Sequence, residues 1–370
     1  MIYLDHAATS PVRREALEAM WPFLTGEFGN PSSSHALGGA AARALEEARG
    51  RVARFLGGRA SATLFTAGGT ESINTAVKGL ALGAPRERRI VISAIEHEAT
   101  VESADFLRRV HGFEVAVAPV DSDGRLDLEA LAALLTPGTA LVSILAASNE
   151  IGTVQDVPAV AALCRERRIP LHVDAVQAAG WLDLPSMGAD AVSISGHKLG
   201  APKGVGALML RSRLPFEPLL HGGGQERDRR SGTENVAFAV ALGTAVSLVD
   251  PSRAARVAAV RDVFAERVAV LAPRAAATGS AEHRLPSIAS YVVPGRSGES
   301  ILLALEERGV VVSSGSACAA GRDEPSDVLL ALGIDPRVAQ TAVRFSFGAE
   351  STAEDAERAA SAFAEVVERA

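Results

Sequence analysis

The chain has 370 residues, of which 48% are hydrophobic, and it carries a net charge of -7 at pH 7. This length is enough to bury a large core and to form two lobes, and the lack of a basic excess argues against a broad nucleic-acid surface. No signal-peptide pattern opens the sequence and no apolar run approaches roughly 18 residues, so we expect a cytoplasmic protein that does not enter a membrane.

Up to about residue 210, short β-rich runs alternate with helical patterns. The β-rich runs cover residues 63–65, 89–93, 113–117, 141–146, 171–174, 191–195 and 206–210. The helical patterns fall at about 70–80, 100–110, 127–135 and 157–168. This alternation predicts a largely parallel sheet covered by helices, and ligands bind beyond the carboxyl ends of the strands in such sheets.

From about residue 250 the composition changes to helices rich in alanine and arginine. Strand patterns follow at 287–293, 310–312 and 343–347, with a helix expected at 300–307. The last helix is expected to start at a capping box formed by Ser351 and Glu354. Together these elements predict a second, smaller α+β lobe.

Lysine is rare in this chain. Only three of the 37 basic residues are lysines, and one of them, Lys198, comes shortly after a predicted strand. An amine can lose its proton and form a Schiff base with an aldehyde, which a guanidinium does not do. We therefore interpret Lys198 as a functional amine. The alternative is an ordinary surface lysine, which is the interpretation that fits Lys78 and Lys203.

The two cysteines, Cys164 and Cys318, lie in different surroundings and in no metal-binding spacing, so we expect no metal site. Cys164 belongs to a helical segment, where a buried small hydrophobic residue is the favoured interpretation. Cys318 lies in a loop of small residues that offers little apolar cover, which indicates an exposed thiol that the protein uses. A packing role for Cys318 is the weaker alternative.

Polar residues follow several of the predicted strands. Gly69 and Thr70 join a strand to a helix, where backbone N–H groups bind anions, with a plain turn capped by Thr70 as the alternative. Asp174 ends an apolar strand three residues before Gln177, and a carboxylate buried there needs a cationic partner unless it caps the next helix. His97 follows another strand and is placed to stack on a ring, although a lone histidine is usually structural.

One ligand would satisfy these groups together. The chain offers an amine for an aldehyde, a carboxylate for a ring nitrogen, an amide for a ring hydroxyl, and an anion cradle for a phosphate. The residues that would supply them are Lys198, Asp174, Gln177 and, for the phosphate, Gly69, Thr70, Ser195 and His197. Pyridoxal 5'-phosphate (PLP) carries all four groups, so the sequence predicts a PLP site at the carboxyl edge of the sheet.

In the order of its motifs the chain resembles the NifS/IscS-type cysteine desulfurases of the class V aminotransferase family, which are fold-type I PLP enzymes. The matching segments are YLDHAAT at 3–9, GNPSS at 29–33, FTAGGTES at 65–72, EH at 96–97, NEIG at 149–152, HVDAVQ at 172–177, SGHK at 195–198, PKG at 202–204, GGGQER at 222–227, RSGTEN at 230–235, SGSAC at 314–318 and RFS at 344–346. Two positions depart from the family pattern: Ala67-Gly68-Gly69 replaces a common Ser-Gly-Ala, and Asp228 stands where glycine is frequent.

The resemblance implies an α/β fold with two domains. The large PLP-binding domain, at 15–252, would be built on a mostly parallel seven-stranded sheet. The smaller α+β domain, at 1–14 and 253–370, would carry the loop of Cys318. The resemblance also implies a homodimer, because Thr233 would reach the phosphate bound by the partner subunit.

The resemblance further implies roles for single residues. The residues that would bind the cofactor are Gly69, Thr70, His97, Asn149, Asp174, Gln177, Ser195, His197, Lys198 and Thr233. Asn149 and Arg344 would bind the substrate carboxylate, for which the planar fork of arginine is suited, with a structural ion pair as the alternative for Arg344. Lys198, Cys318 and His97 would be the catalytic residues.

The implied reaction converts L-cysteine to L-alanine and leaves the sulfur as a persulfide on Cys318. The segment from Cys318 to Ser326 is as long as in the long-loop branch, so we expect direct transfer to an iron-sulfur scaffold or another sulfur acceptor, including one for tRNA thiolation. A PLP aminotransferase or lyase would have no use for Cys318, and a regulator or sulfur carrier would show no turnover. A nicotinamide oxidoreductase is disfavoured because the glycine motif is wrong.

Overall fold

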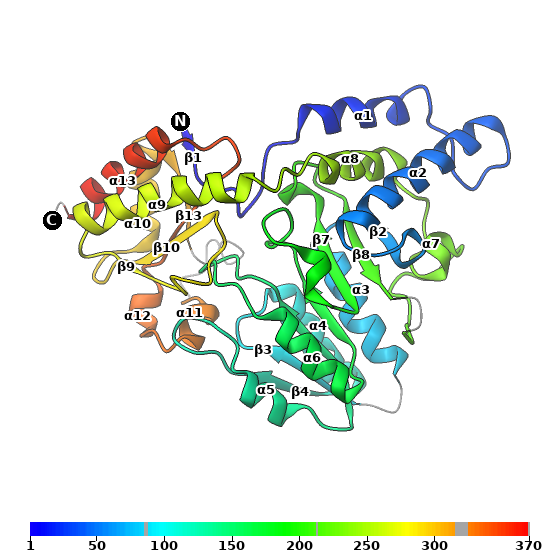
Figure 1. The fold of residues 1–370 in the computed structure, drawn as a ribbon, viewed down its shortest axis with the longest axis horizontal. Coiled ribbons are helices and arrows are strands. Elements are labelled where there is room, and N and C mark those ends of the chain that lie inside the picture. Colours follow the sequence, from blue (N-terminus) through cyan, green and yellow to red (C-terminus); the bar gives the residue numbers. More distant parts are fainter. Residues whose placement is uncertain (85–87, 212–213, 315–324, 369–370) are drawn as a thin grey trace.

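The computed structural model describes residues 1–84, 88–211, 214–314 and 325–368, so Cys318 lies outside the described residues. Two lobes lie next to each other, one with a large sheet and its helices and one with a smaller sheet (Figure 1). The two ends of the chain both lie at the smaller lobe. The prediction of two lobes is therefore confirmed.

The larger lobe is built on a seven-stranded sheet in the order β2-β8-β7-β6-β5-β3-β4. Its strands are β2 (Thr63–Thr66), β3 (Arg89–Ser93), β4 (Glu114–Ala118), β5 (Thr139–Leu145), β6 (Leu171–Asp174), β7 (Ala191–Ser195) and β8 (Gly206–Leu210). The neighbours from β7 to β4 run parallel, whereas β8 runs antiparallel to both β7 and β2. The predicted, largely parallel sheet is confirmed, with one reversed strand that the pattern did not indicate.

Helices cover both faces of this sheet. Successive residues of a strand point to opposite faces, so a strand that is apolar throughout presents apolar side chains on both faces, and both must be buried. Ile90 and Ile92 pack with residues of α3 (Gly69–Gly83) and α4 (Glu98–His111), whereas Val91 packs on the other side. The helices of that other side are α1 (Arg14–Leu24), α2 (Ala36–Phe55), α5 (Leu128–Leu134), α6 (Val157–Arg167) and α8 (Val236–Ser247). The four helices predicted between strands are confirmed, whereas α1, α2 and α8 had not been predicted.

The smaller lobe contains a four-stranded sheet in the order β12-β13-β10-β9 and the separate parallel pair β1-β11. Its strands are β1 (Ile2–Tyr3), β9 (Ala276–Ala277), β10 (Ile288–Val292), β11 (Val310–Val311), β12 (Ser313–Ser314) and β13 (Val343–Ser346). Its helices are α9 (Arg253–Leu271), α10 (Gly298–Glu306), α11 (Asp327–Ala331), α12 (Pro336–Ala339) and α13 (Ala353–Glu368). The strand predicted at 310–312 is confirmed as β11, which ends one residue earlier at Val311 and pairs with β1. The chain then pairs with β13 through the separate strand β12.

Aromatic side chains hold the second core together. The Phe345 ring of β13 lies 4.4 Å from the Phe264 ring of α9 and 5.1 Å from the Phe363 ring of α13, measured between centroids. All three side chains are fully buried. Tilted and edge-on ring pairs of this kind add to the stabilisation from buried area. This packing fixes β13, and therefore Arg344, against the helices of the smaller lobe.

The capping box predicted at Ser351 and Glu354 is wrong by one residue. Thr352 Oγ1 accepts a hydrogen bond of 3.1 Å from the backbone N–H of Asp355, whose carboxylate accepts one of 3.2 Å from the Thr352 N–H. This reciprocal pair is the capping box of α13. Ser351 Oγ instead accepts from the N–H of Gly348.

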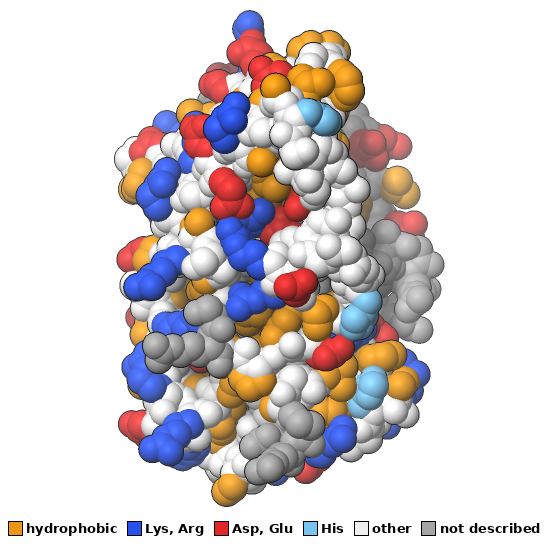
Figure 2. All heavy atoms as spheres, turned by 90° about the vertical axis from the view of Figure 1, so that its right-hand side faces the viewer, with side chains coloured by type: hydrophobic (Ala, Val, Ile, Leu, Met, Phe, Trp, Pro, Cys, Tyr) orange, Lys and Arg blue, Asp and Glu red, His pale blue; other side chains and the backbone are white. Residues whose placement is uncertain are grey.

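Several global features bear on the function. No helix in the described ranges is both long enough and apolar enough to cross a membrane. In the same ranges no group of three or more His, Cys, Asp or Glu side chains is arranged to hold a metal ion. On the side of the molecule seen in Figure 2, basic side chains lie among acidic and apolar ones, so the charge of that face is mixed. The domain boundaries at 14/15 and 252/253 stay a prediction.

Candidate active site

A cavity of about 390 Å³ lies between the carboxyl edge of the large sheet and the smaller lobe. Ten of the residues that the sequence singled out line it, namely Gly69, Thr70, His97, Asn149, Asp174, Gln177, Ser195, His197, Lys198 and Arg344. Nine of them, from Gly69 to Lys198, meet here because β2, β3, β5, β6 and β7 end at this edge of the large sheet, whereas Arg344 comes from β13 of the smaller lobe. Thr233 does not line this cavity, and Cys318 lies outside the described residues.

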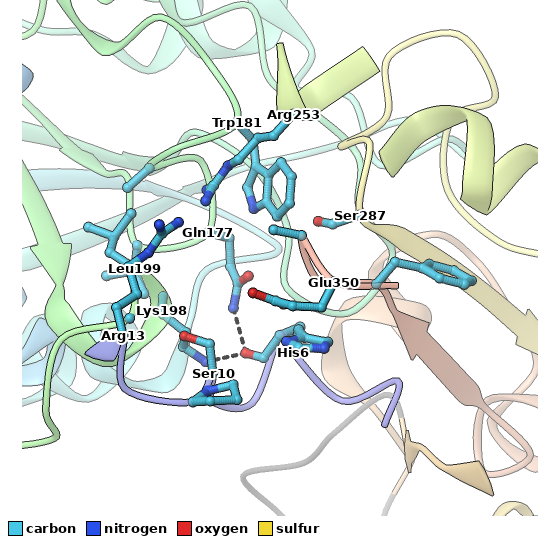
Figure 3. A pocket seen from close by; sticks show the side chains of 18 residues that line it. His6, Ser10, Arg13, Gln177, Trp181, Lys198, Leu199, Arg253, Ser287 and Glu350 are labelled. Atoms are coloured by element: carbon cyan, nitrogen blue, oxygen red, sulfur yellow. Dashed lines mark hydrogen bonds between the residues drawn. The ribbon is translucent and has the colours of Figure 1, made fainter. Parts of the chain in front are cut away.

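Lys198 ends a single helical turn, Gly196–Lys198, that follows β7. Its Nζ donates to the backbone carbonyl oxygens of Ala7 and Ala8, at 2.7 Å for the latter. The amide of Gln177 donates to the same Ala7 oxygen at 2.9 Å, so that amine and amide converge on the N-terminal segment (Figure 3). The amine is thus held inside the cavity by backbone acceptors that carry no charge.

Asp174 is the last residue of β6 and is 6% exposed. Burial raises the pKa of Asp174, while the charge of His97, a hydrogen bond from the Val176 N–H and the charge of Lys198 lower it. The Val176 bond is 2.9 Å long and closes a turn, so the alternative of Asp174 as cap of a following helix is wrong. A buried carboxylate beside a cavity suits a ligand that brings a positive charge.

His97 is the N-cap of α4, and its ring contacts the first turn of that helix. Its Nδ1 accepts a hydrogen bond of 3.0 Å from the backbone N–H of Ala99. In a neutral imidazole the other nitrogen, Nε2, then carries the proton. The ring is half-buried and lines the cavity. The histidine is therefore both a structural cap and a cavity residue, which combines the two interpretations left open by the sequence.

The start of α3 lies where the sequence predicts an anion cradle. The N-cap is Gly68 and Thr70 is the second helical residue, so the alternative of Thr70 as cap is wrong. A Cβ on Gly69 would lie 2.8 Å from Val176 Cγ2 and 3.2 Å from Ser195 Cβ, so a side chain there would crowd the cradle. The positive end of this 15-residue helix, together with hydroxyls, favours a phosphate.

His197 contributes a neutral ring to the same cradle. Burial, helped by the charges of Lys198 and Lys203, lowers the pKa of His197 to about 4. Its Nδ1 lies 3.2 Å from Thr9 Oγ1. An imidazole that stays uncharged at neutral pH binds a phosphate as a hydrogen-bond donor and adds no net charge.

Arg344 of β13 reaches the opposite side of the cavity and is 1% exposed. Its guanidinium pairs with the Asp5 carboxylate at 2.8 Å and donates to the Asn149 backbone oxygen at 3.0 Å. Its Nε is buried and has no hydrogen-bond partner among the described residues. The alternative of a structural ion pair is thus correct in part, but the unsatisfied Nε is a donor that a substrate carboxylate would satisfy.

Several residues near the site had been missed by sequence reasoning. Asp5 had been quoted only as part of a matching motif, and the carbonyl groups of Ala7 and Ala8 carry no side-chain signal at all. Glu96 had also been quoted only as part of a motif, although it is 7% exposed and directly precedes His97. A charged residue three positions after the end of an apolar strand was the one signal that could have identified Glu96.

Thr233 lies on an exposed segment between α7 (Gln225–Asp228) and α8. Buried Glu226 anchors this segment, because its carboxylate forms an ion pair with buried Arg49 and accepts from the N–H of Phe65 at 3.2 Å. Asp228, at the position where glycine is frequent in the resembling family, has a φ of 61°, the left-handed conformation that glycine tolerates best. The departure at Asp228 therefore keeps the backbone that a glycine would favour.

The alternatives for the remaining candidates are settled by burial and contacts. Cys164 is 1% exposed, and burial raises the pKa of its thiol to about 12, so it is an inert core residue as predicted. The ammonium of Lys78 lies over the Phe106 ring at 4.4 Å, and neither Lys78 nor Lys203 lines the cavity. Lys198 is therefore the lysine that the fold brings into the cavity.

The comparisons with known proteins agree with this geometry. Residues 2–359 match the family model described as aminotransferase class-V. The chain belongs to this family. It is 44% identical over 360 residues to a cysteine desulfurase of Cereibacter sphaeroides, covering 96% of this chain and 93% of the relative. It is 41% identical over 360 residues to the cysteine desulfurase IscS of Dictyoglomus turgidum, covering 96% and 91%.

The fold of the chain is also similar to that of a solved relative. The solved structure of a NifS-like protein superposes with a TM-score of 0.92 at 36% identity and covers 99% of both chains. The resemblance to NifS/IscS-type cysteine desulfurases and the fold-type I class are therefore confirmed. The roles of the single residues are not tested by these likenesses and remain proposals.

Proposed function

We propose that the chain is a PLP-dependent cysteine desulfurase, which converts L-cysteine to L-alanine and passes on the sulfur. The observation that carries the proposal is that one cavity brings together Lys198, Asp174 and Arg344. These groups suit, in turn, an aldehyde, a ring nitrogen and an amino-acid carboxylate. The family of the chain and the names of its relatives support the same reaction.

The residues that line the cavity fit PLP. The cradle of Gly69, Thr70 and Ser195 would hold the phosphate at the start of α3, where the helix dipole favours negative charge. Asp174 would face the ring nitrogen and Gln177 the ring oxygen. When bound, PLP supplies an aldehyde that combines with amines and a ring that stabilises negative charge on the substrate carbon.

The chain's own groups would then bind the substrate and move its protons. Arg344 and Asn149 would hold the carboxylate of cysteine, the first through its unsatisfied Nε. The amine of Lys198 would take the proton from Cα, because it is the basic group that the backbone holds inside the cavity. With Nδ1 occupied by the Ala99 N–H, a neutral His97 would carry its proton on Nε2 and would act as a hydrogen-bond donor to a bound group.

Sulfur would leave through Cys318, which lies outside the described residues. Its thiolate would attack the sulfur of the bound cysteine, so that an S–S bond forms while the bond from Cβ to sulfur breaks. The electron pair of the broken bond stays with the carbon skeleton, which takes up a proton to give alanine. The product on the protein is a persulfide, which an iron-sulfur scaffold or an acceptor for tRNA thiolation would receive.

A homodimer would complete the site. Thr233 is exposed and does not line the cavity of its own chain, as expected of a residue that serves a second copy. An apolar group on and beside α1 is also exposed, with Leu17 at 50%, Trp21 at 61% and Phe28 at 68%. Large exposed apolar groups are typical of association surfaces. A cytoplasmic location is proposed with the same function and remains a prediction from the sequence.

Labelling of the lysine tests the proposed function. Wild-type protein incubated with PLP and reduced with borohydride should carry the label on Lys198, because that amine lies in the cavity. Lys198→Ala should lose both the label and alanine production, whereas the control Lys203→Ala should keep both. A label on Lys78 or Lys203 in the wild type would contradict the assignment.

A further inference from the structure

Glu96 is a buried acid that the proposed reaction does not use. It lies in the turn between β3 and α4 and is 7% exposed. Its Oε1 accepts two hydrogen bonds, one of 2.9 Å from the backbone N–H of Leu145 and one from the hydroxyl of Ser93. The side chain thus joins the end of β3 to the end of β5.

The position of Leu145 explains what this contact does. The pairing of β3 with β5 ends at Ile92 and Ser143, so β5 continues for two residues beyond the last residue that pairs with β3. On its other side Leu145 pairs with Asp174 of β6, and the Ala146 N–H donates to the Asp174 backbone oxygen at 2.8 Å. The backbone N–H of Leu145 therefore donates to Glu96 Oε1 and not to a carbonyl oxygen of β3. This contact lies at the end of β5 where Leu145 pairs with Asp174.

The second oxygen of Glu96 indicates that the group is uncharged. Oε2 is buried and has no hydrogen-bond partner among the described residues. Burial, helped by the charge of Asp174, raises the pKa of Glu96 to about 8 against the hydrogen bonds from Ser93 and Leu145. Around neutral pH the carboxyl is mostly protonated, so its contact with Leu145 does not need a negative charge.

We propose that Glu96 is a positioning residue for the cofactor, which acts as a neutral acceptor that fixes Asp174 through Leu145 and His97 through the adjoining turn. Since Asp174 and His97 are proposed to contact the ring, the inference rests on the proposed function. Loss of the acceptor at Oε1 leaves the Leu145 N–H buried and unpaired, which loosens β5 beside Asp174. The effect should appear first in cofactor affinity.

Three substitutions separate the acceptor from the charge. Glu96→Gln keeps a neutral acceptor of the same length and should bind PLP as the wild type does. Glu96→Asp keeps an acid but is one carbon shorter and no longer reaches Leu145, and Glu96→Met removes the acceptor. Both should weaken PLP binding by about tenfold, the scale expected for an unpaired buried donor. The proposal therefore predicts that Glu96→Gln binds PLP more tightly than Glu96→Asp does.

Gln155 supplies a matched control. It is 5% exposed, and its Oε1 accepts from the backbone N–H of Leu126 at 2.8 Å, at a place that does not line the cavity. Gln155→Met should lower the melting temperature as Glu96→Met does but leave PLP affinity unchanged. This comparison separates a positioning role from a loss of stability alone.

The measurement is a titration of each apoprotein with PLP, followed by absorbance and by visible circular dichroism of the bound ring. In the loaded enzymes kcat should fall in Glu96→Met while KM for cysteine stays within about twofold, because Arg344 is untouched. Equal PLP affinity in wild type and Glu96→Asp, or a loss in Glu96→Gln as large as in Glu96→Asp, would overturn the inference. Failure of the wild type itself to bind PLP would instead overturn the proposed function.

Discussion

Replacement of Glu96 by glutamine should change how the stability of the apoprotein depends on pH. Burial raises the pKa of Glu96 from 4.5 to about 8 in the folded protein. The folded state therefore keeps a proton that the unfolded chain releases near pH 4.5. The contribution of this proton to stability is fully present below about pH 4.5 and is lost as the pH rises to about 8.

The size of the effect follows from the two pKa values. They differ by about 3.5, and one pKa unit corresponds to ~1.4 kcal/mol, so Glu96 should lower the free energy of unfolding by about 5 kcal/mol over the whole range. Between about pH 5 and about pH 8 the loss is roughly 3 to 4 kcal/mol. The glutamine of Glu96→Gln does not titrate. From about pH 5 to about pH 8 the free energy of unfolding should therefore fall by roughly 3 to 4 kcal/mol more in the wild type than in Glu96→Gln.

Urea unfolding of both apoproteins at several pH values measures this difference. Other groups titrate over the same interval, including His197, but they are shared by the two proteins and cancel in the comparison. Glu129→Gln, at an exposed position of α5, is the control and should follow the wild-type curve. Parallel curves for wild type and Glu96→Gln would refute the reasoning, because they would mean that Glu96 is ionised in the folded protein.

Two further predictions concern the substrate and the sulfur. Arg344→Lys removes the fork and its contact with the Asn149 oxygen, so KM for cysteine should rise about 10- to 100-fold while PLP affinity stays unchanged; an unchanged KM in steady-state kinetics would show that the carboxylate binds elsewhere. Cys318→Ser should bind PLP and cysteine but form no persulfide, whereas Cys164→Ser, at a buried helical position, should keep sulfur transfer. Mass spectrometry after cysteine treatment checks this, and a persulfide on Cys164 would contradict the mechanism.

Much of the cavity could be predicted because strand patterns and chemistry coincide. Asp174 and Ser195 end apolar runs, and the rule that parallel strands finish at one edge places them together without any knowledge of distances. His97 was placed by the same rule. The sequence pattern did not predict the helices α1, α2 and α8. Most residues of α8 are buried, so its sequence lacks the alternation of polar and apolar residues that identifies an amphipathic helix.

The sequence by itself determined which groups are available and roughly where the strands end, because those properties depend on residues that are close along the chain. Only the tertiary structure decided which groups contact one another. Asp5 forms an ion pair with Arg344, 339 positions away in sequence. The carbonyl groups of Ala7 and Ala8 accept hydrogen bonds from Lys198, and Glu96 accepts one from the backbone N–H of Leu145. Backbone acceptors leave no side-chain signal, and an ion pair or a buried acid is defined by its partner. Such contacts exist only once the two lobes and the strand ends have come together.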